Sequence, residues 1–131
     1  MYGKFDQAEK YFRKVIDVNV AEINKRAHIV GRISLANIDI NRNNFQQALY
    51  SLESLKREIE NDPDIMLEER GDLYSDMIDC LYQKGDYTEA FEIGNEALLY
   101  INSHSSGYNY HKAAVLISQA RALNGLGRMQ E

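Results

Sequence analysis

The clearest copy of a repeated motif is GDYTEAFEIG at Gly85–Gly94. It combines a turn-forming glycine, an aromatic residue two positions later and an alanine three positions after that. Related copies are GKFDQAEKYF at Gly3–Phe12 and NNFQQALYSL at Asn43–Leu52, and GRMQE at Gly127–Glu131 begins in the same way. The four copies start at positions 3, 43, 85 and 127, which are 40, 42 and 42 residues apart. A fixed period in this range is typical of stacked repeats and not of one closed core.

Apolar residues between and within the copies recur at the three- and four-residue steps of amphipathic helices. We therefore predict six helices, at about residues 5–18, 20–42, 45–60, 63–84, 87–101 and 108–124. Short polar segments with asparagine, glycine or proline separate them. Consecutive helices joined by turns this short lie antiparallel and side by side. The sequence therefore predicts an all-α fold made of helical hairpins.

Three local features refine this prediction. Gly31 interrupts the second predicted helix, and a glycine is tolerated there when a neighbouring backbone lies close, so we expect a tight helix crossing. Asparagine readily takes the left-handed conformation that ends a helix, which makes Asn41–Asn44 a turn. We expect the last helix to end at Gly125–Gly127, where the fourth copy of the motif begins.

The repeated motif resembles the tetratricopeptide repeat family. The third copy matches best, with Tyr74, Leu81, Gly85, Tyr87, Ala90 and Ala97 at the positions that the family uses for bulky, turn-forming and small residues. The resemblance implies a right-handed α-solenoid of antiparallel helix hairpins. Because the usual repeat has about 34 residues, a period of 40–42 implies helices that are longer by about one turn. The chain departs from the family's pattern at several positions. Arg32 and Asp39 replace aromatic residues, Ile78 replaces a small residue, Gly94 replaces a bulky residue and Gln119 replaces a leucine.

The phase of the repeat predicts one repeat domain over residues 1–131, cut from a longer protein. Its parts are the second helix of a repeat at 1–19, repeats at 20–60 and 61–102, and the first helix of a further repeat at 107–131. Both terminal helices would then lack a partner within their own repeat. We expect copies of the chain to associate end to end through these uncovered faces, which contain Tyr11, Phe12, Val15, Leu116 and Leu123.

The charge of the chain is unevenly spread. The net charge is −5, but residues 1–57 carry 10 basic and 6 acidic residues (+4), whereas residues 58–131 carry 5 and 14 (−9). An acidic surface repels phosphates, so we expect no direct contact with nucleic acid. No apolar run reaches the roughly 18 residues of a membrane helix, and no signal peptide is evident, so we expect a cytoplasmic protein that does not bind membranes.

The sequence predicts neither an enzyme nor a cofactor or metal site. His28, His104 and His111 are dispersed along the chain, and Cys80 is the single cysteine. A metal site needs convergent ligands at defined spacing, which these residues do not supply. The lone cysteine cannot form an internal disulfide, which fits a reducing compartment.

The resemblance implies that function lies on a concave wall lined by the first helix of each repeat. The candidate residues on that wall are Ile33, Asn37, Asn41, Ser75, Asp76, Asp79, Tyr82, Ile117, Arg121 and Asn124. Its aspartates either attract a basic or polar partner or simply solvate the helix. We expect a non-enzymatic scaffold module that binds a protein or peptide segment in the groove. The alternative is the peptide-sensing region of a bacterial transcriptional regulator or signalling protein.

Overall fold

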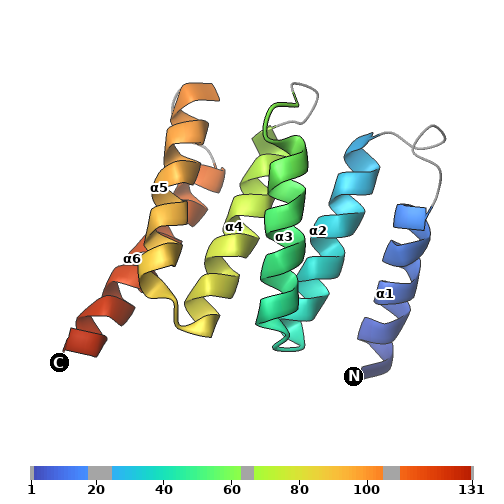
Figure 1. The fold of residues 1–131 in the computed structure, drawn as a ribbon, viewed down its shortest axis with the longest axis horizontal. Coiled ribbons are helices and arrows are strands. Elements are labelled where there is room, and N and C mark those ends of the chain that lie inside the picture. The colour runs from blue at the N-terminus through green and yellow to red at the C-terminus, as the bar shows by residue number, and fades with distance from the viewer. Residues whose placement is uncertain (1, 18–24, 63–66, 105–109, 131) are drawn as a thin grey trace. The chain divides into compact units, whose positions relative to one another are not determined.

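The computed structural model describes residues 2–17, 25–62, 67–104 and 110–130 (Figure 1). These ranges contain six α-helices and no strand, which confirms the predicted all-α fold. The helices are α1 (Tyr2–Asp17), α2 (Lys25–Asn41), α3 (Phe45–Ile59), α4 (Leu67–Lys84), α5 (Tyr87–His104) and α6 (Tyr110–Gln130). The starts predicted for the second, fourth and sixth helices fall within 18–24, 63–66 and 105–109, outside the described residues. None of the described helices is long and apolar enough to cross a membrane.

The chain forms two compact units, Met1–Ile65 and Met66–Glu131. In the first unit, α2 packs against both α1 and α3. Gly31 lies at the contact of α2 with α1, because a Cβ atom placed on it would be 3.3 Å from Cγ1 of Val15. The tight crossing predicted at this glycine is confirmed. The buried side chains of α2 and α3 include Ile29, Ile40, Leu52 and Leu55.

In the second unit, each of α4, α5 and α6 packs against the other two. Its largest fully buried side chains come from all three helices: Leu73, Met77, Ile78, Cys80, Leu81, Ile101 and Val115. Burial of side chains this large is the main favourable contribution to the stability of such a unit. Five of these seven side chains belong to α4, so α4 forms the centre of this core and α5 and α6 cover it.

The turn between α2 and α3 ends α2 in a Schellman motif. Asn43 has a φ of 64°, and its N–H donates to the carbonyl oxygen of Ile40 at 2.9 Å. The N–H of Asn44 donates to the carbonyl oxygen of Asp39 at 2.8 Å. These bonds satisfy carbonyl groups that the helix leaves without partners, and they require a left-handed residue at position 43. The helix-ending role predicted for this asparagine turn is confirmed.

The turn between α4 and α5 has the same geometry, 42 residues further on. Gly85 has a φ of 92° and donates to the carbonyl oxygen of Tyr82 at 3.1 Å. Asp86 donates to the carbonyl oxygen of Leu81 at 2.9 Å. The repeat in the sequence is therefore also a repeat in backbone hydrogen bonding, with glycine instead of asparagine at the left-handed position.

The end of α6 differs from the prediction. We expected a turn at Gly125–Gly127, but α6 continues through both glycines to Gln130. Gly125 is needed for packing, since a Cβ atom there would lie 2.8 Å from the ring of Tyr87. A glycine costs a helix about 1 kcal/mol relative to alanine, which weakens the helix without ending it.

Ion pairs join α1 to the end of α2. The guanidinium group of Arg42 contacts the carboxylates of Asp6 and Glu9, and Arg13 also donates to Glu9 at 2.9 Å. Hydrogen bonds from Arg42 and then from Arg13 lower the pKa of Glu9. Burial raises the pKa of the neighbouring Asp39. The first helix is therefore held by charge as well as by its apolar face.

Candidate binding site

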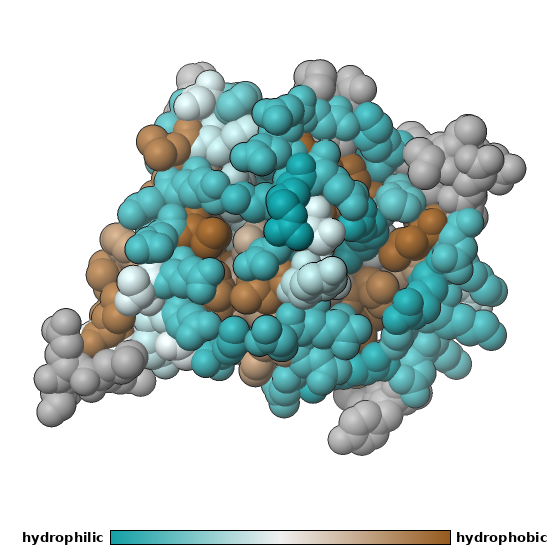
Figure 2. All heavy atoms as spheres, viewed as in Figure 1, coloured by the Kyte–Doolittle hydropathy of each residue, from teal (hydrophilic) through white to brown (hydrophobic). Residues whose placement is uncertain are grey.

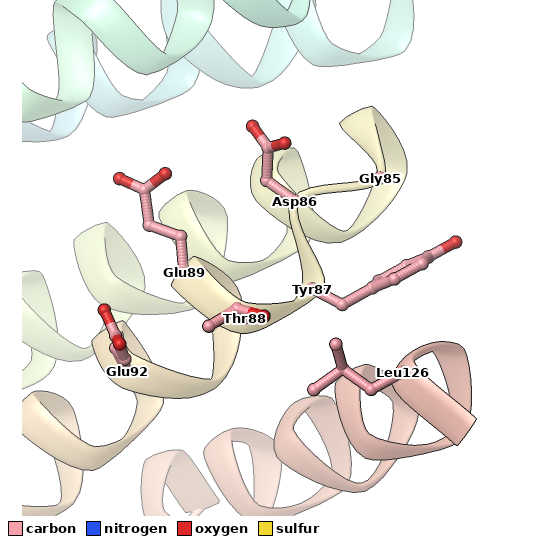
Figure 3. A pocket seen from close by; sticks show the side chains of 7 residues that line it. All are labelled: Gly85, Asp86, Tyr87, Thr88, Glu89, Glu92 and Leu126. Carbon is pink, nitrogen blue, oxygen red and sulfur yellow. The ribbon is translucent and has the colours of Figure 1, made fainter. Parts of the chain in front are cut away.

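A shallow hollow lies where α4 turns into α5 (Figure 3). It has a volume of about 540 Å³ and lies entirely within the second unit. The Schellman turn at Gly85 reverses the chain, so that the first turns of α5 form one side of the hollow, while α6 supplies the other. The lining residues are Gly85, Asp86, Tyr87, Thr88, Glu89, Glu92 and Leu126.

Acidic and apolar groups occupy different parts of this hollow. The carboxylates of Asp86, Glu89 and Glu92 extend to one side of α5, whereas Tyr87 lies beside Leu126 of α6 (Figure 3). The three acidic residues recur every third position, which keeps their side chains on neighbouring parts of the helix surface. Carboxylates in this position also stabilise the positive end of the helix dipole.

The aromatic ring in the hollow is held in place from two sides. The ring of Tyr87 lies against Tyr82 of α4, with centroids 5.4 Å apart and planes at 56°. On the other side it contacts the backbone of α6 at Gly125. Tilted aromatic pairs of this kind are favourable beyond the area they bury. The apolar floor of the hollow is therefore preformed.

The hollow has an excess of negative charge. Lys84 Nζ lies 3.3 Å from Asp86 Oδ2, so this ammonium group partly neutralises one carboxylate. Glu89 and Glu92 are exposed. A lysine or arginine side chain of a partner fits these features, because its aliphatic stem can cover Tyr87 and Leu126 while its charge meets the glutamates.

The four predicted residues of α4 share one half-exposed face of that helix: Ser75, Asp76, Asp79 and Tyr82. The carboxylate oxygens of Asp79 accept hydrogen bonds from Gln83 Nε2, each at 3.1 Å. Tyr82 connects this face to the hollow through its ring contact with Tyr87. Among the predicted residues, Tyr82 is the one with a ring contact to a residue that lines the hollow in the described part of the chain.

The predicted residues of α2 and α6 are spread more widely. Ile33 is only 8% exposed, so it offers little surface to a partner. Asn37 and Asn41 are exposed, and the side-chain amide of Asn41 donates to the backbone and side-chain oxygens of Asn37, each at 3.1 Å. On α6, Ile117, Arg121 and Asn124 are exposed.

His104 and Cys80, two residue types that often take part in catalysis, are held in contacts with the rest of the chain. The ring of His104 stacks on Tyr100 with centroids 4.1 Å apart, and its Nδ1 lies 2.8 Å from the carbonyl oxygen of that tyrosine. The Cys80 side chain is fully buried. Within the described ranges, no group of three or more histidine, cysteine, aspartate or glutamate side chains could hold a metal ion.

No protein-family model, no curated protein and no solved structure matches this chain. The candidate site therefore depends on the geometry described above.

None of the residues that line the hollow was among the predicted site residues. The acidic side of the hollow was visible as Asp86-x-x-Glu89-x-x-Glu92 at a helix start, which is a signal for three carboxylates along one side. Leu126 carried no such signal, because its place in the hollow depends on the packing of α6 against α5.

Proposed function

We propose that this chain is a non-enzymatic interaction module that binds a basic segment of a partner protein. The observation that carries the proposal is the hollow at the start of α5, where two exposed glutamates adjoin a preformed apolar floor. An acidic surface of this kind raises both the association rate and the specificity for a positively charged partner. The net charge of −9 over residues 58–131 acts in the same direction.

We further propose that the hairpins belong to a tetratricopeptide-like, right-handed stack. The support is the period of 42 residues, which relates the two Schellman turns and also the buried stripes of the second helices. In α3 these buried residues are Ala48, Leu52, Leu55 and Ile59, and in α5 they are Ala90, Gly94, Ala97 and Ile101. Stacked hairpins form long surfaces that suit extended segments.

In this proposal, the polar face of α4 extends the binding surface beyond the hollow. Tyr82 lies between the two, since its ring contacts Tyr87. Asp76 and Asp79 would then contact further residues of the same segment. A partner with several basic residues therefore binds more tightly than one with a single lysine.

A charge-reversal experiment tests the hollow. The probe is a fluorescent peptide of about ten residues with alternating lysine and alanine, and binding is measured by anisotropy at low and moderate salt. Glu89→Lys combined with Glu92→Lys should weaken binding at least about tenfold, since two favourable charge contacts become repulsive.

The matched control is Asp17→Lys combined with Glu53→Lys, which changes the net charge of the chain by the same amount in the first unit. This control should bind the peptide within about threefold of the unmodified chain once added salt has screened long-range attraction. Equal losses in both variants would mean that net charge alone attracts the peptide, and the hollow would not be the binding site.

A further inference from the structure

One face of α6 exposes apolar side chains in a regular stripe. Leu116, Ala120, Leu123 and Gly127 follow one another at steps of four, three and four residues, so they lie along one side of the helix. Leu116 is 48% exposed and Leu123 is 52% exposed. Hydrophobic side chains are also visible on the surface along α6 in Figure 2. We call these four residues the α6 stripe.

The repeat period indicates what kind of element covers such a stripe. The α6 stripe corresponds, 42 residues earlier, to Tyr74, Ile78 and Leu81 of α4 and to Gly85 in the turn that follows α4. There the ring of Tyr74 lies 6.3 Å from the ring of Tyr100 on α5, and Ile78 and Leu81 are fully buried. The second helix of the hairpin therefore packs beside this position in the second unit.

The first unit has the same contact one period earlier. Arg32 of α2 forms an ion pair with Glu58 of α3. Both residues precede the pair Tyr74 and Tyr100 by 42 positions, although the chemistry of the contact is different. At this position α2 contacts α3, and α4 contacts α5. A helix is therefore the element that fits the α6 stripe.

We propose that the α6 stripe binds an amphipathic helix of a partner protein, with acidic residues beside its apolar side. The charge of α6 selects this partner, because α6 contains Lys112, Arg121 and Arg128 and no aspartate or glutamate. Arg121 is exposed and available for a carboxylate of the incoming helix. This surface is separate from the hollow, so the proposal does not depend on the function proposed above.

Small residues in the stripe allow the two helices to approach closely. In the core, Gly31, Gly94 and Gly125 each receive a side chain of a neighbouring helix. A Cβ atom on Gly127 would meet nothing within 4 Å, so the same kind of close contact is open there. Along the stripe, Ala120 lies between Leu116 and Leu123, and Gly127 follows Leu123, so the incoming helix would meet large and small residues in turn.

A second copy of the chain is a poorer occupant. The exposed side of α1 carries Lys4, Lys10, Arg13 and Lys14, and its only large exposed apolar side chain within Lys4–Asp17 is Tyr11. An end-to-end contact would therefore place a polar helix with four basic and three acidic residues within Lys4–Asp17 against the apolar stripe of the basic α6. Such a contact lacks both apolar and charge complementarity.

The test uses two peptides taken from this chain. The first has the sequence of α5, Tyr87–His104, which is the helix beside the equivalent stripe of α4 and contains three glutamates and no lysine or arginine. The second has the sequence of α3, Phe45–Ile59, with two glutamates balanced by one lysine and one arginine. Calorimetry with the whole chain should give a dissociation constant at least about fivefold lower for the first peptide.

Two variants locate the binding. Leu116→Glu combined with Leu123→Glu should weaken binding of the first peptide at least about tenfold, while circular dichroism remains unchanged, because both side chains are exposed. Leu99→Glu replaces a leucine that is 72% exposed on α5 and should leave the affinity unchanged.

Any of four results would overturn the proposal. The first peptide could fail to bind, or bind no more tightly than the second. It could bind the double variant equally well, which would mean that it displaces α5 from α4. Finally, sedimentation could reveal dimers of the chain alone that Leu116→Glu and Leu123→Glu dissociate, which would make a second copy the occupant.

Discussion

The side chain of Gln119 on α6 fills the space that Gly94 leaves on α5. A Cβ atom on Gly94 would lie 2.5 Å from Cγ of Gln119. The Nε2 group of Gln119 donates to the carbonyl oxygen of Phe91 at 3.1 Å and to Oδ1 of Asn95 at 2.9 Å. Both residues depart from the pattern of the motif, and they compensate for each other across the contact of α5 with α6.

Because these two residues are coupled, the effect of Gly94→Ala on the free energy of unfolding should change sign when Gln119 is also replaced. Gly94→Ala alone should lower the free energy of unfolding by about 1–2 kcal/mol, because Gln119 must move and lose its hydrogen bonds. In a Gln119→Ala background the same substitution should raise it by up to about 1 kcal/mol, since alanine favours the helix and the obstructing side chain is gone. Urea denaturation of the four proteins of this cycle measures both effects. Additive changes would mean that the two residues are independent.

Gly125 and Gly127 offer a matched pair on α6. A Cβ atom on Gly125 would lie 2.8 Å from the ring of Tyr87, whereas one on Gly127 meets nothing within 4 Å. Gly125→Ala should therefore destabilise the second unit by about 1–3 kcal/mol, because the tyrosine ring must shift. Gly127→Ala should stabilise it by up to about 1 kcal/mol through helix propensity. Thermal unfolding midpoints that move in the same direction for both variants would contradict this account.

The pH dependence of stability should report on Glu9. Its pKa in the folded chain is below the ordinary value of 4.5, because Arg42 and Arg13 hydrogen-bond the carboxylate. The ionised group therefore stabilises the fold above about pH 4.5, and this contribution is lost as the pH falls through the folded-state pKa. The difference in free energy of unfolding between the unmodified chain and Glu9→Gln should be largest near neutral pH and should shrink on acidification.

Two other charged residues complete the pH experiment. Burial raises the pKa of Asp39, so this residue contributes in the opposite sense. Its ionisation opposes folding as the pH rises through 3.8, the ordinary pKa of an aspartate. Comparison with Glu9→Gln subtracts the part of this effect that comes from burial, which is the largest cause; the charge of Glu9 also raises the pKa of Asp39, and that part is removed with it. In an Arg42→Met background, Glu9→Gln should have a much weaker pH dependence. An unchanged dependence there would assign the effect to another group.

Local chemistry explains why the helices and turns could be predicted. Amphipathic periodicity places the six helices, and the left-handed positions 43 and 85 contain asparagine and glycine, the residues that tolerate a positive φ. The end of α6 could not be predicted in this way. Gly125 and Gly127 resemble turn residues, but Gly125 is a packing residue whose contact, Tyr87, lies on another helix.

The candidate site divides in the same way. The carboxylates of Asp86, Glu89 and Glu92 follow from their spacing at the start of α5, whereas Leu126 reaches the hollow only because α6 packs on α5. The predicted residue Ile33 shows the reverse case, since its position on α2 suggested a wall but its side chain is buried. Spacing identifies the face of a helix, and packing decides whether that face stays exposed.

The sequence by itself determined the repeat of 42 residues, the helices and the chemistry of the turns, because these depend on interactions between residues within a few positions of each other. Tertiary structure alone decided that Gln119 occupies the space above Gly94 and that Tyr87 is held between Tyr82 and Gly125. Such contacts join residues on different helices, and their fit depends on how those helices pack.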